Sequence, residues 1–456
     1  MVKQIRYKQS TVSPTNLDES VQDSTVKSPY VYTQFWLKLS GVLPLKSVQD
    51  GQKGIKIMST IYSLYCRLIS SMLWILSIRA FILMFIDDPK LAFKLGDLTV
   101  LFTDNRYIYY RMVYFCWSAS ATLIATSYAL DETQSCLVPF NTFNSSRLNH
   151  YYNTTTYRKL KYLLTICFCW VIIVTITGVL SHLHYQSMII YNLLSSPSWN
   201  PIDLANLNVN PSFWLILHAI WYFYITSIVV FTAFHFSLIC SVLEQQFDLV
   251  TSKTELILYS DNIKLDLKDS SLLSQYVEHN YLCETLIKSN SFWKSVISTI
   301  SGFYIVNLCY IFYTLSYGQV NLNLFTFYCL IAGFNFLILY LIFFPAAAVA
   351  KKAFAVNTAL YLSGSEFLPS FIYVESFILR LKCTIGYSAY RFFVIKYTTI
   401  GAVISATITY FLIVADFSRS TGSSTPTNDT DIDVSLSYNR TLFTNPFFIN
   451  ISSESG

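Results

Sequence analysis

Near the end of the chain, small and polar residues recur within an apolar stretch at spacings of three and four. They are Ala402, Ser405, Thr409, Ile413 and Asp416. On an α-helix, residues at these spacings share one face. A small, mildly polar face that ends on a carboxylate can line a water-filled path for cations, because rings of acidic side chains concentrate cations. The same pattern suits a helix–helix packing face enriched in small residues, so the spacing leaves both interpretations open.

A second group of residues has the composition of a small-molecule site, in which aromatic walls carry a few polar groups. Its members lie in the outer halves of four apolar stretches: His182, Trp214, His218, Trp221, Tyr222, Tyr304, Asn307, Tyr310 and Asn335. Aromatic faces of this kind also suit sugar rings. Because the chain contains 34 Tyr and 35 Phe, ordinary packing is the alternative for each of these residues.

The sequence lacks the spacings that mark common catalytic and metal sites. It contains no GxSxG, no HExxH and no phosphate loop, and its six His residues are scattered. We therefore expect neither an enzyme nor a bound metal or cofactor, and we interpret the ten cysteines as packing residues. The net charge of +5 is too modest to indicate a nucleic-acid partner.

The elements that position both groups are apolar segments long enough to cross a membrane. The chain is 53% hydrophobic and only 12% charged, about half the charged share of a soluble domain. Seven stretches approach or exceed the roughly 20 residues that a spanning helix needs: 68–86, 112–130, 162–181, 213–242, 295–317, 324–349 and 397–415. The composition therefore predicts an all-α, multi-pass membrane protein with seven transmembrane helices.

Lys and Arg predict the orientation of these helices, because positively charged loops stay in the cytoplasm. With the N-terminus inside, the cytoplasmic segments contain 23 basic residues and the external segments contain five. The first 58 residues are polar and show no early apolar core, so we expect no signal peptide. Seven crossings then place the C-terminus outside the cell.

The last 39 residues fit an exposed, disordered external tail. They are rich in Ser, Thr, Asn and Asp, and they contain glycosylation sequons at Asn428, Asn439 and Asn450.

Arg79 lies within the first predicted span, where a charged side chain is costly. We expect Arg79 to reach the membrane surface or to meet Asp87 or Asp88, and we assign it no function.

The cytoplasmic side contains two amphipathic stretches. From Asp269 onward, Leu272, Tyr276, Cys283 and Leu286 recur at helical spacing, which predicts a long helix that starts in the cytoplasm and runs directly into the fifth span. Residues 371–390 form the second stretch. Such helices normally pack on one another and can form an inner domain shared between subunits, and the alternative is a groove for a partner helix.

The segment Tyr387–Phe417 resembles the C-terminal signature of the arthropod gustatory receptors, a family of the insect chemoreceptor superfamily. The signature contains Ser-Ala, Phe-Phe, Gly-Ala-Val and Thr-Tyr followed by five apolar residues, and the matching positions here are Ser388-Ala389, Phe392-Phe393, Gly401-Ala402-Val403, Thr409-Tyr410 and the closing Phe417. A weaker similarity covers His279–Trp293, which precedes the family's fifth span. The chain departs from the family at Asp416, where Gln is usual, at Lys396, where an acid or amide is usual, and at Arg391, where a small residue is usual.

The resemblance implies a tastant-gated, non-selective cation channel in the plasma membrane. It implies four subunits, identical or mixed with related receptors, around a pore lined by the last span, and an outward-facing tastant pocket in each subunit. Asp416 would then form a ring of four carboxylates, in which neighbouring charges raise some pKa values, and Ile413 and Phe417 would form an apolar gate that closes by dewetting. The alternative is that Asp416 only marks where the helix leaves the membrane.

These expectations divide the chain into seven segments. They are a cytoplasmic N-terminal segment (1–58), transmembrane helices one to four (59–242), a cytoplasmic helical linker (243–294), helices five and six (295–349), a cytoplasmic anchor helix (350–390), the pore-lining seventh helix (391–417) and the extracellular tail (418–456).

A metabotropic seven-helix chemoreceptor is the second candidate, and a transporter is the third. The sequence shows no Asp-Arg-Tyr-like triplet after the third span and no Asn-Pro-x-x-Tyr in the seventh, and the predicted orientation is inverted relative to receptors that couple to G proteins. These features favour the channel.

Overall fold

The structure is a computed structural model of the full chain. It describes residues 29–42, 53–86, 88, 91–92, 95–97, 106–131, 135–139, 155–195, 211–259, 265–317, 322–362, 385–390 and 392–422. The sequons Asn428, Asn439 and Asn450 lie outside these ranges, as does most of the predicted tail. Residues up to Phe411 form one compact unit, and the rest of the chain forms a second unit.

The described residues are almost entirely helical, as the sequence predicts. The helices are α1 (Pro29–Leu39), α2 (Lys53–Leu83), α4 (Arg106–Ala129), the short 3-10 turn η3 (Ser135–Leu137), α7 (Thr155–Ser195), α9 (Pro211–Tyr259), α10 (Leu265–Tyr317), α11 (Leu322–Leu362) and α13 (Tyr397–Gly422). Two strands, β1 (Ser388–Ala389) and β2 (Phe393–Val394), pair antiparallel just before α13, with Ser388 opposite Val394.

Helix α9 forms the centre of the first unit. It packs against α11, α7, α10, α1 and α4, and its residues from Ile225 to Leu243 are all buried. The sequence explains this position, because α9 is apolar on all sides between Ile225 and Leu243, and a helix that is apolar all round belongs inside a protein or a membrane. The rings of Phe231, Phe234 and Phe236 are each 0% exposed.

Five of the described helices are long and apolar enough to cross a membrane: Thr60–Leu83, Arg158–Leu180, Ile216–Tyr259, Ser270–Leu315 and Phe325–Leu360. They match the first and the third to sixth predicted spans. The predicted second span coincides with α4, whose arginines, tyrosines and hydroxyl residues dilute its apolar character. The seventh coincides with the shorter apolar helix segment Tyr397–Ile413. The count of seven crossings and the orientation remain predictions.

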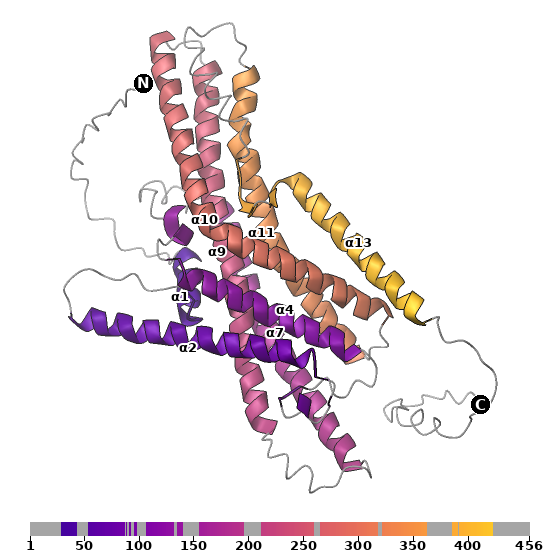
Figure 1. The fold of residues 1–456 in the computed structure, drawn as a ribbon. Helices are drawn as coiled ribbons and strands as arrows, with labels where there is room; N and C mark the ends of the chain where they lie inside the picture. Colours follow the sequence, from indigo (N-terminus) through magenta and orange to yellow (C-terminus); the bar gives the residue numbers. More distant parts are fainter. Residues whose placement is uncertain are drawn as a thin grey trace, which may run out of the picture. The chain divides into compact units, whose positions relative to one another are not determined.

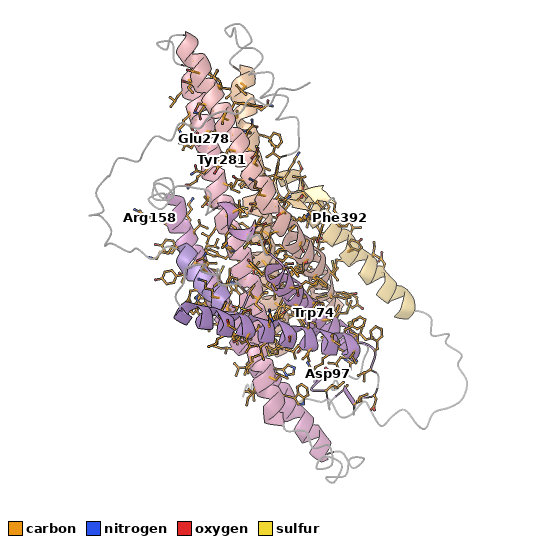
Figure 2. The ribbon with its side chains drawn as sticks, turned by 60° about the vertical axis from the view of Figure 1, so that its left-hand side comes forward. Trp74, Asp97, Arg158, Glu278, Tyr281 and Phe392 are labelled. Carbon is orange, nitrogen blue, oxygen red and sulfur yellow. The ribbon has the colours of Figure 1, made fainter. Side chains whose placement is uncertain are left out.

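Three helices continue past the spans predicted from the sequence and lie side by side at one end of the unit (Figure 1). We call this part the three-helix extension: residues 243–259 of α9, 265–294 of α10 and 350–362 of α11. The uninterrupted helix predicted to run from Asp269 into the fifth span is present, because α10 runs for 53 residues. Figure 2 labels Glu278 and Tyr281 in this extension, far from Asp97 at the opposite end of the unit.

The predicted anchor helix 350–390 needs a correction at its C-terminal end. Helix α11 ends at Leu362, and residues 363–384 lie outside the described part. The last residues are extended rather than helical, because Gly386 has φ +154° and Ser388–Ala389 pair with β2. The sequence also gave no indication of α1, which packs on α9 through a stacked pair of rings, Trp36 and Phe231, with centroids 5.4 Å apart.

Candidate functional site

The hairpin of β1 and β2 holds the start of α13 against α10, and Asn290 of α10 is its main anchor. Asn290 Nδ2 donates to Ser388 Oγ at 3.0 Å, and Asn290 Oδ1 accepts from the Ser388 N–H at 3.1 Å. The fully buried Tyr387 is hydrogen-bonded through its hydroxyl to Ser289 at 3.1 Å, and burial raises the pKa of Tyr387 well above its ordinary value. The Ser-Ala part of the C-terminal signature therefore fixes the base of α13.

The weaker similarity, His279–Trp293, lies on the part of α10 that organises this region. His279 Nε2 donates to the Ala353 carbonyl of α11 at 3.1 Å. Trp293 is 0% exposed, and its ring packs against Phe236 of α9 at a centroid distance of 4.8 Å. These residues tie α10 to α9 and α11 next to the hairpin that Asn290 anchors.

Helix α13 begins at Tyr397, where the Lys396 N–H donates to Thr399 Oγ1 at 3.2 Å. One face of the helix then packs on the subunit, and we call it the packing face: Ile400, Val403, Thr407 and Phe411, all half-buried. The Thr407 carbonyl accepts from Cys309 Sγ of α10 at 3.6 Å, and Phe411 meets Phe312 with ring centroids 6.4 Å apart.

The predicted pore residues lie on the other side of α13. Ala402, Ser405 and Thr409 are all exposed in the isolated chain, and we call them the open face. At 3.6 residues per turn, the centre of the open face lies roughly 180° around the helix from the centre of the packing face. The side chain of Thr409 hydrogen-bonds the Ser405 carbonyl at 2.9 Å. The open face therefore has no covering element among the described residues of the same chain.

The end of α13 belongs to the second unit. There, Ile413 and Asp416 are exposed. Phe417 lies within the helix, but its side chain is outside the described part of the structure. The gate predicted at these three residues stays a prediction.

At the start of α9, the predicted pocket residues form an aromatic cluster with α4. The cluster consists of Trp214, His218, Trp221 and Tyr114, and we call it the Trp214 cluster. Tyr114 stacks on Trp221 with ring centroids 4.0 Å apart and an interplanar angle of 16°. His218 Nδ1 donates to the Trp214 carbonyl at 2.7 Å, and its side chain is 6% exposed. Tyr222 turns toward α7, where Gly178 leaves room for its ring.

Arg79 joins this cluster, and Asp87, one of its expected partners, lies outside the described residues. Its guanidinium lies 4.8 Å from the ring centroid of Trp214, and it donates to the Leu95 carbonyl at 2.6 Å and to the Tyr114 hydroxyl at 3.0 Å. The contact with Trp214 requires Gly96, because a Cβ added there would lie 2.4 Å from the ring and Gly96 has φ +75°. An aromatic face and two acceptors offset much of the cost of placing a cation in a span.

A buried ion pair fixes the same end of the unit. Arg111 of α4 and Asp97 are 2.6 Å apart, and each is 6% exposed. Arg111 also donates to the Ile86 carbonyl at 2.8 Å. Because removing one partner of a buried pair leaves an uncompensated charge, this pair holds residues 86 and 97 against α4, beside the Trp214 cluster.

Deeper in the unit, α10 and α11 share a buried pair of amides, Asn307 and Asn335. Both side chains are 0% exposed, and Asn307 Nδ2 donates to Asn335 Oδ1 at 3.3 Å. Asn307 Oδ1 and Asn335 Nδ2 have no partner among the described residues. Since buried polar atoms normally find a partner, these two atoms are open to a hydrogen bond with a small polar group.

The structure therefore divides the predicted pocket residues into two groups. Trp214, His218 and Trp221 lie together, and Asn307 and Asn335 form the amide pair. Tyr304 and Tyr310 lie on α10 near the amide pair in sequence, and Tyr304 is 1% exposed. His182 lies in α7, but its side chain is outside the described residues.

Sequence reasoning missed Tyr114 and the role of Arg79. The signal was available, because an Arg within an apolar span needs acceptors or an aromatic face nearby. None of the predicted pocket residues lines the groove of about 630 Å³ between α4 and α10. Among the described residues, no group of three or more His, Cys, Asp or Glu could hold a metal ion.

Comparisons with known proteins bear on the fold. No protein-family model matches the chain, and no curated protein matches it. The structure of the insect olfactory receptor OR5 from Machilis hrabei in complex with eugenol is similar, with a TM-score of 0.65 and 14% sequence identity over 85% of this chain and 97% of the OR5 chain. A second structure of that receptor gives a TM-score of 0.63 and 14% identity over 84% and 96% of the two chains.

Identity this low establishes the fold and not the activity. The described helices nevertheless cover nearly the whole length of the olfactory receptor in the same arrangement. The chain has the fold of an insect olfactory receptor, which agrees with the fold that the resemblance of its C-terminal residues implies.

Proposed function

We propose that the protein is a gustatory-receptor-like chemosensory receptor, a tastant-gated and non-selective cation channel. The observation that carries the proposal is the division of α13 into two faces. The packing face binds the subunit, and the open face presents Ala402, Ser405 and Thr409 away from it. A spanning helix with a small, polar and uncovered face has its partner outside the subunit, and water in a shared pore is the partner that suits hydroxyl groups.

The proposal includes seven crossings of the plasma membrane, with the N-terminus in the cytoplasm and the tail outside the cell. Four subunits, identical or mixed with related receptors, surround the pore, and the three-helix extension joins them on the cytoplasmic side. The helix α4 is the second span, since its charged end is neutralised by the Arg111–Asp97 pair. In the tail, Asn428, Asn439 and Asn450 are the proposed glycosylation sites.

The ligand site of the proposal lies between the Trp214 cluster and the amide pair. Aromatic walls beside a free donor and a free acceptor suit a small organic molecule with one or two polar groups. The olfactory receptor OR5, which has the same fold, has been determined with eugenol, and this supports a small organic ligand. His182, Tyr222, Tyr304 and Tyr310 complete the proposed site.

The proposed ion pathway ends at the outer end of α13. Four copies of Asp416 form a ring of carboxylates that concentrates cations, while Ile413 and Phe417 close the pore by dewetting when no ligand is bound. A ring facing water also avoids the cost of about 2.5–3.5 kcal/mol for a carboxylate in the middle of the hydrocarbon core.

Recordings from oocytes test the channel directly. The receptor is expressed alone and tested with sugars, bitter compounds and amino acids, and patches are then excised into a solution without nucleotide. A channel gives ligand-evoked cation current in the excised patch. Responses that need GTP and vanish on excision would instead establish the metabotropic alternative.

Substitutions at Asp416 test the pore assignment. We expect Asp416→Asn to leave surface expression intact and to lower conductance or divalent permeability, and Asp416→Lys to block cation current. Two variants that conduct like the wild type would place Asp416 outside the pore.

Epitope tags test the orientation separately. A C-terminal tag should be accessible to antibody on intact cells, and an N-terminal tag should become accessible only after permeabilisation. The reverse pattern would contradict both the family resemblance and the pore.

A further inference from the structure

A groove of about 630 Å³ lies between α4 and α10 and opens on the surface of the subunit. Ligand sites in proteins usually enclose about 300–1,000 Å³, so the groove has room for an organic molecule. It is lined by Met112, Phe115, Cys116, Leu123, Thr126, Ser127, Leu130, Ser295, Ser298, Thr299, Gly302, Phe303, Val306 and Tyr390. We call it the Ser298 groove.

The polarity of the Ser298 groove changes along its length. At the end near the three-helix extension, its walls carry hydroxyl groups, and Ser127 Oγ lies 3.2 Å from Ser295 Oγ. At the other end the walls are apolar, and the rings of Phe115 and Phe303 have centroids 6.3 Å apart. The middle of the groove is open at Gly302, where an added Cβ would meet no atom within 4 Å.

A cation stands at the hydroxyl end. The Nζ atom of Lys294 lies 5.9 Å from the ring centroid of Tyr390, which lines the groove. Tyr390 has φ +48°, a left-handed conformation that is unfavourable for residues other than Gly, Asn and Asp. The hairpin therefore accepts strain at Tyr390 and presents an exposed aromatic ring beside the cation.

The length of the groove matches one leaflet of a membrane. From Ser295 to Val306 the helix rises about 17 Å at 1.5 Å per residue, and half of a hydrocarbon core is about 15 Å. In the proposed orientation, Lys294 lies at the cytoplasmic surface, where anionic lipids attract Lys and Arg. The order of cation, hydroxyl groups and apolar walls along the groove matches the order of phosphate, glycerol esters and acyl chain along a phospholipid.

We propose that the Ser298 groove binds one phospholipid of the cytoplasmic leaflet, with an anionic headgroup at Lys294 and Tyr390 and an acyl chain along Gly302 and Val306. Ser298 and Thr299 hydrogen-bond the ester oxygens. The lipid lies beside the Asn290-anchored hairpin at the base of α13. The inference rests on the proposed orientation and is independent of the tastant and of ion conduction.

Photo-crosslinking tests the site with the full-length receptor in lipid nanodiscs. One preparation contains phosphatidylserine with a diazirine in its acyl chain, and a second contains phosphatidylcholine with the same chain. After irradiation, mass spectrometry locates the labelled peptides. We expect labels on residues 112–130 and 295–306, with phosphatidylserine labelling about five times more than phosphatidylcholine, the ratio that corresponds to about 1 kcal/mol for one Lys near a membrane surface.

Two variants and one control sharpen the test. Gly302→Leu fills the groove without a clash and should reduce labelling by both lipids severalfold, while Lys294→Gln should abolish the preference for phosphatidylserine. Lys288→Gln, an exposed Lys on the same helix, should preserve that preference. Size-exclusion profiles confirm that each variant is folded. Unchanged labelling in Gly302→Leu or an unchanged preference in Lys294→Gln would each overturn the proposal.

Discussion

Helices α9 and α13 are both apolar, yet they differ in how much of their surface is buried. Residues 225–243 of α9 are all buried within the subunit, whereas most residues between Tyr397 and Phe411 of α13 are exposed. The two helices differ in side-chain size, since α9 fills the core with rings such as Phe231 and Phe236 and α13 carries Gly401, Ala402 and Ser405. Apolar character therefore makes a helix suited to a membrane, and side-chain size indicates what the helix packs against.

The same difference appears between α9 and α7. Only 22% of the apolar span of α7 is buried, and its exposed residues include Ile172, Ile173 and Ile176. Branched aliphatic side chains suit contact with lipid, and α13 also exposes Ile404, Ile408 and Ile413, while its open face carries only small side chains. The open face is thus distinct both from a lipid-facing helix and from a core helix.

The largest expected effect compares one ring on each helix. Phe236→Ala removes a fully buried side chain and should lower the free energy of unfolding by about 3–5 kcal/mol. Tyr410→Ala removes a side chain that is 60% exposed and should change it by no more than about 0.5 kcal/mol. Thermal unfolding of the detergent-solubilised subunit, followed by size-exclusion chromatography, measures both. Equal losses would show that α13 is covered as fully as α9.

Substitution of one glycine in the core and one in α13 should give a smaller difference in the free energy of unfolding. Gly96→Ala places a Cβ against Trp214 at a positive φ, and should destabilise the subunit by about 2 kcal/mol or more. Gly401 meets nothing within 4 Å, so Gly401→Ala should stabilise the helix by about 0.5–1 kcal/mol. Both values come from the same unfolding assay. A loss of stability or assembly in Gly401→Ala would indicate that a neighbouring subunit approaches α13 at this glycine.

Cysteine substitutions sharpen the difference between the two faces of α13. A charged, water-soluble thiol reagent should block most of the ligand-evoked current in Ser405→Cys and Thr409→Cys. It should leave the current of Val403→Cys unchanged, because that side chain lies on the packing face. Patch recordings before and after the reagent provide the measurement, with the wild type as the control for native cysteines. Block at position 403 alone would reverse the assignment of the faces.

A modest effect is expected at the hairpin that joins α13 to the core. Tyr387→Phe loses the hydrogen bond to Ser289 and should cost about 0.5–1.5 kcal/mol at neutral pH. Burial raises the pKa of Tyr387 in the folded state, so its stabilising contribution is complete below the ordinary pKa of about 10 and decreases above it. Stability measured from pH 8 to pH 11 should show the wild type losing its advantage over Tyr387→Phe. A constant difference over this range would contradict the buried, protonated state of Tyr387.

The sequence predicted the helical class, the long continuous helix α10 and the position of α13. These features depend on local patterns of apolar residues and on a motif of neighbouring residues. It did not predict α1, because the ring contacts of Trp36 with Phe168 of α7 and Phe231 of α9 join residues some 130 to 200 positions apart in the sequence. The contacts of Arg79 were not predicted for the same reason, since its partners Tyr114, Leu95 and Trp214 come from three separate segments.

The opposition between the two faces of α13 shows what sequence spacing can and cannot establish. Spacing grouped Ala402, Ser405 and Thr409 on one side of a helix. The direction of that side relative to the core depended on Cys309 and Phe312 of α10, which contact the packing face. The sequence pointed to Asn307 and Asn335 as two separate candidate residues. It did not predict that they form a buried pair with one unpaired donor and one unpaired acceptor.

The Asn290-anchored hairpin holds α13 more firmly at its start than along its length. Directional hydrogen bonds hold Ser388 at the base, and apolar contacts, which have no preferred direction, predominate farther along. The hairpin therefore holds the start of α13 in place, and the rest of the helix can move across α10 more easily, because its apolar contacts do not fix its position. From Tyr397 to Phe411 the helix is about 21 Å long, so a tilt of about 10° at the hairpin moves its far end by about 4 Å. A slight strain on the short hairpin is thereby amplified into a displacement wider than a water molecule.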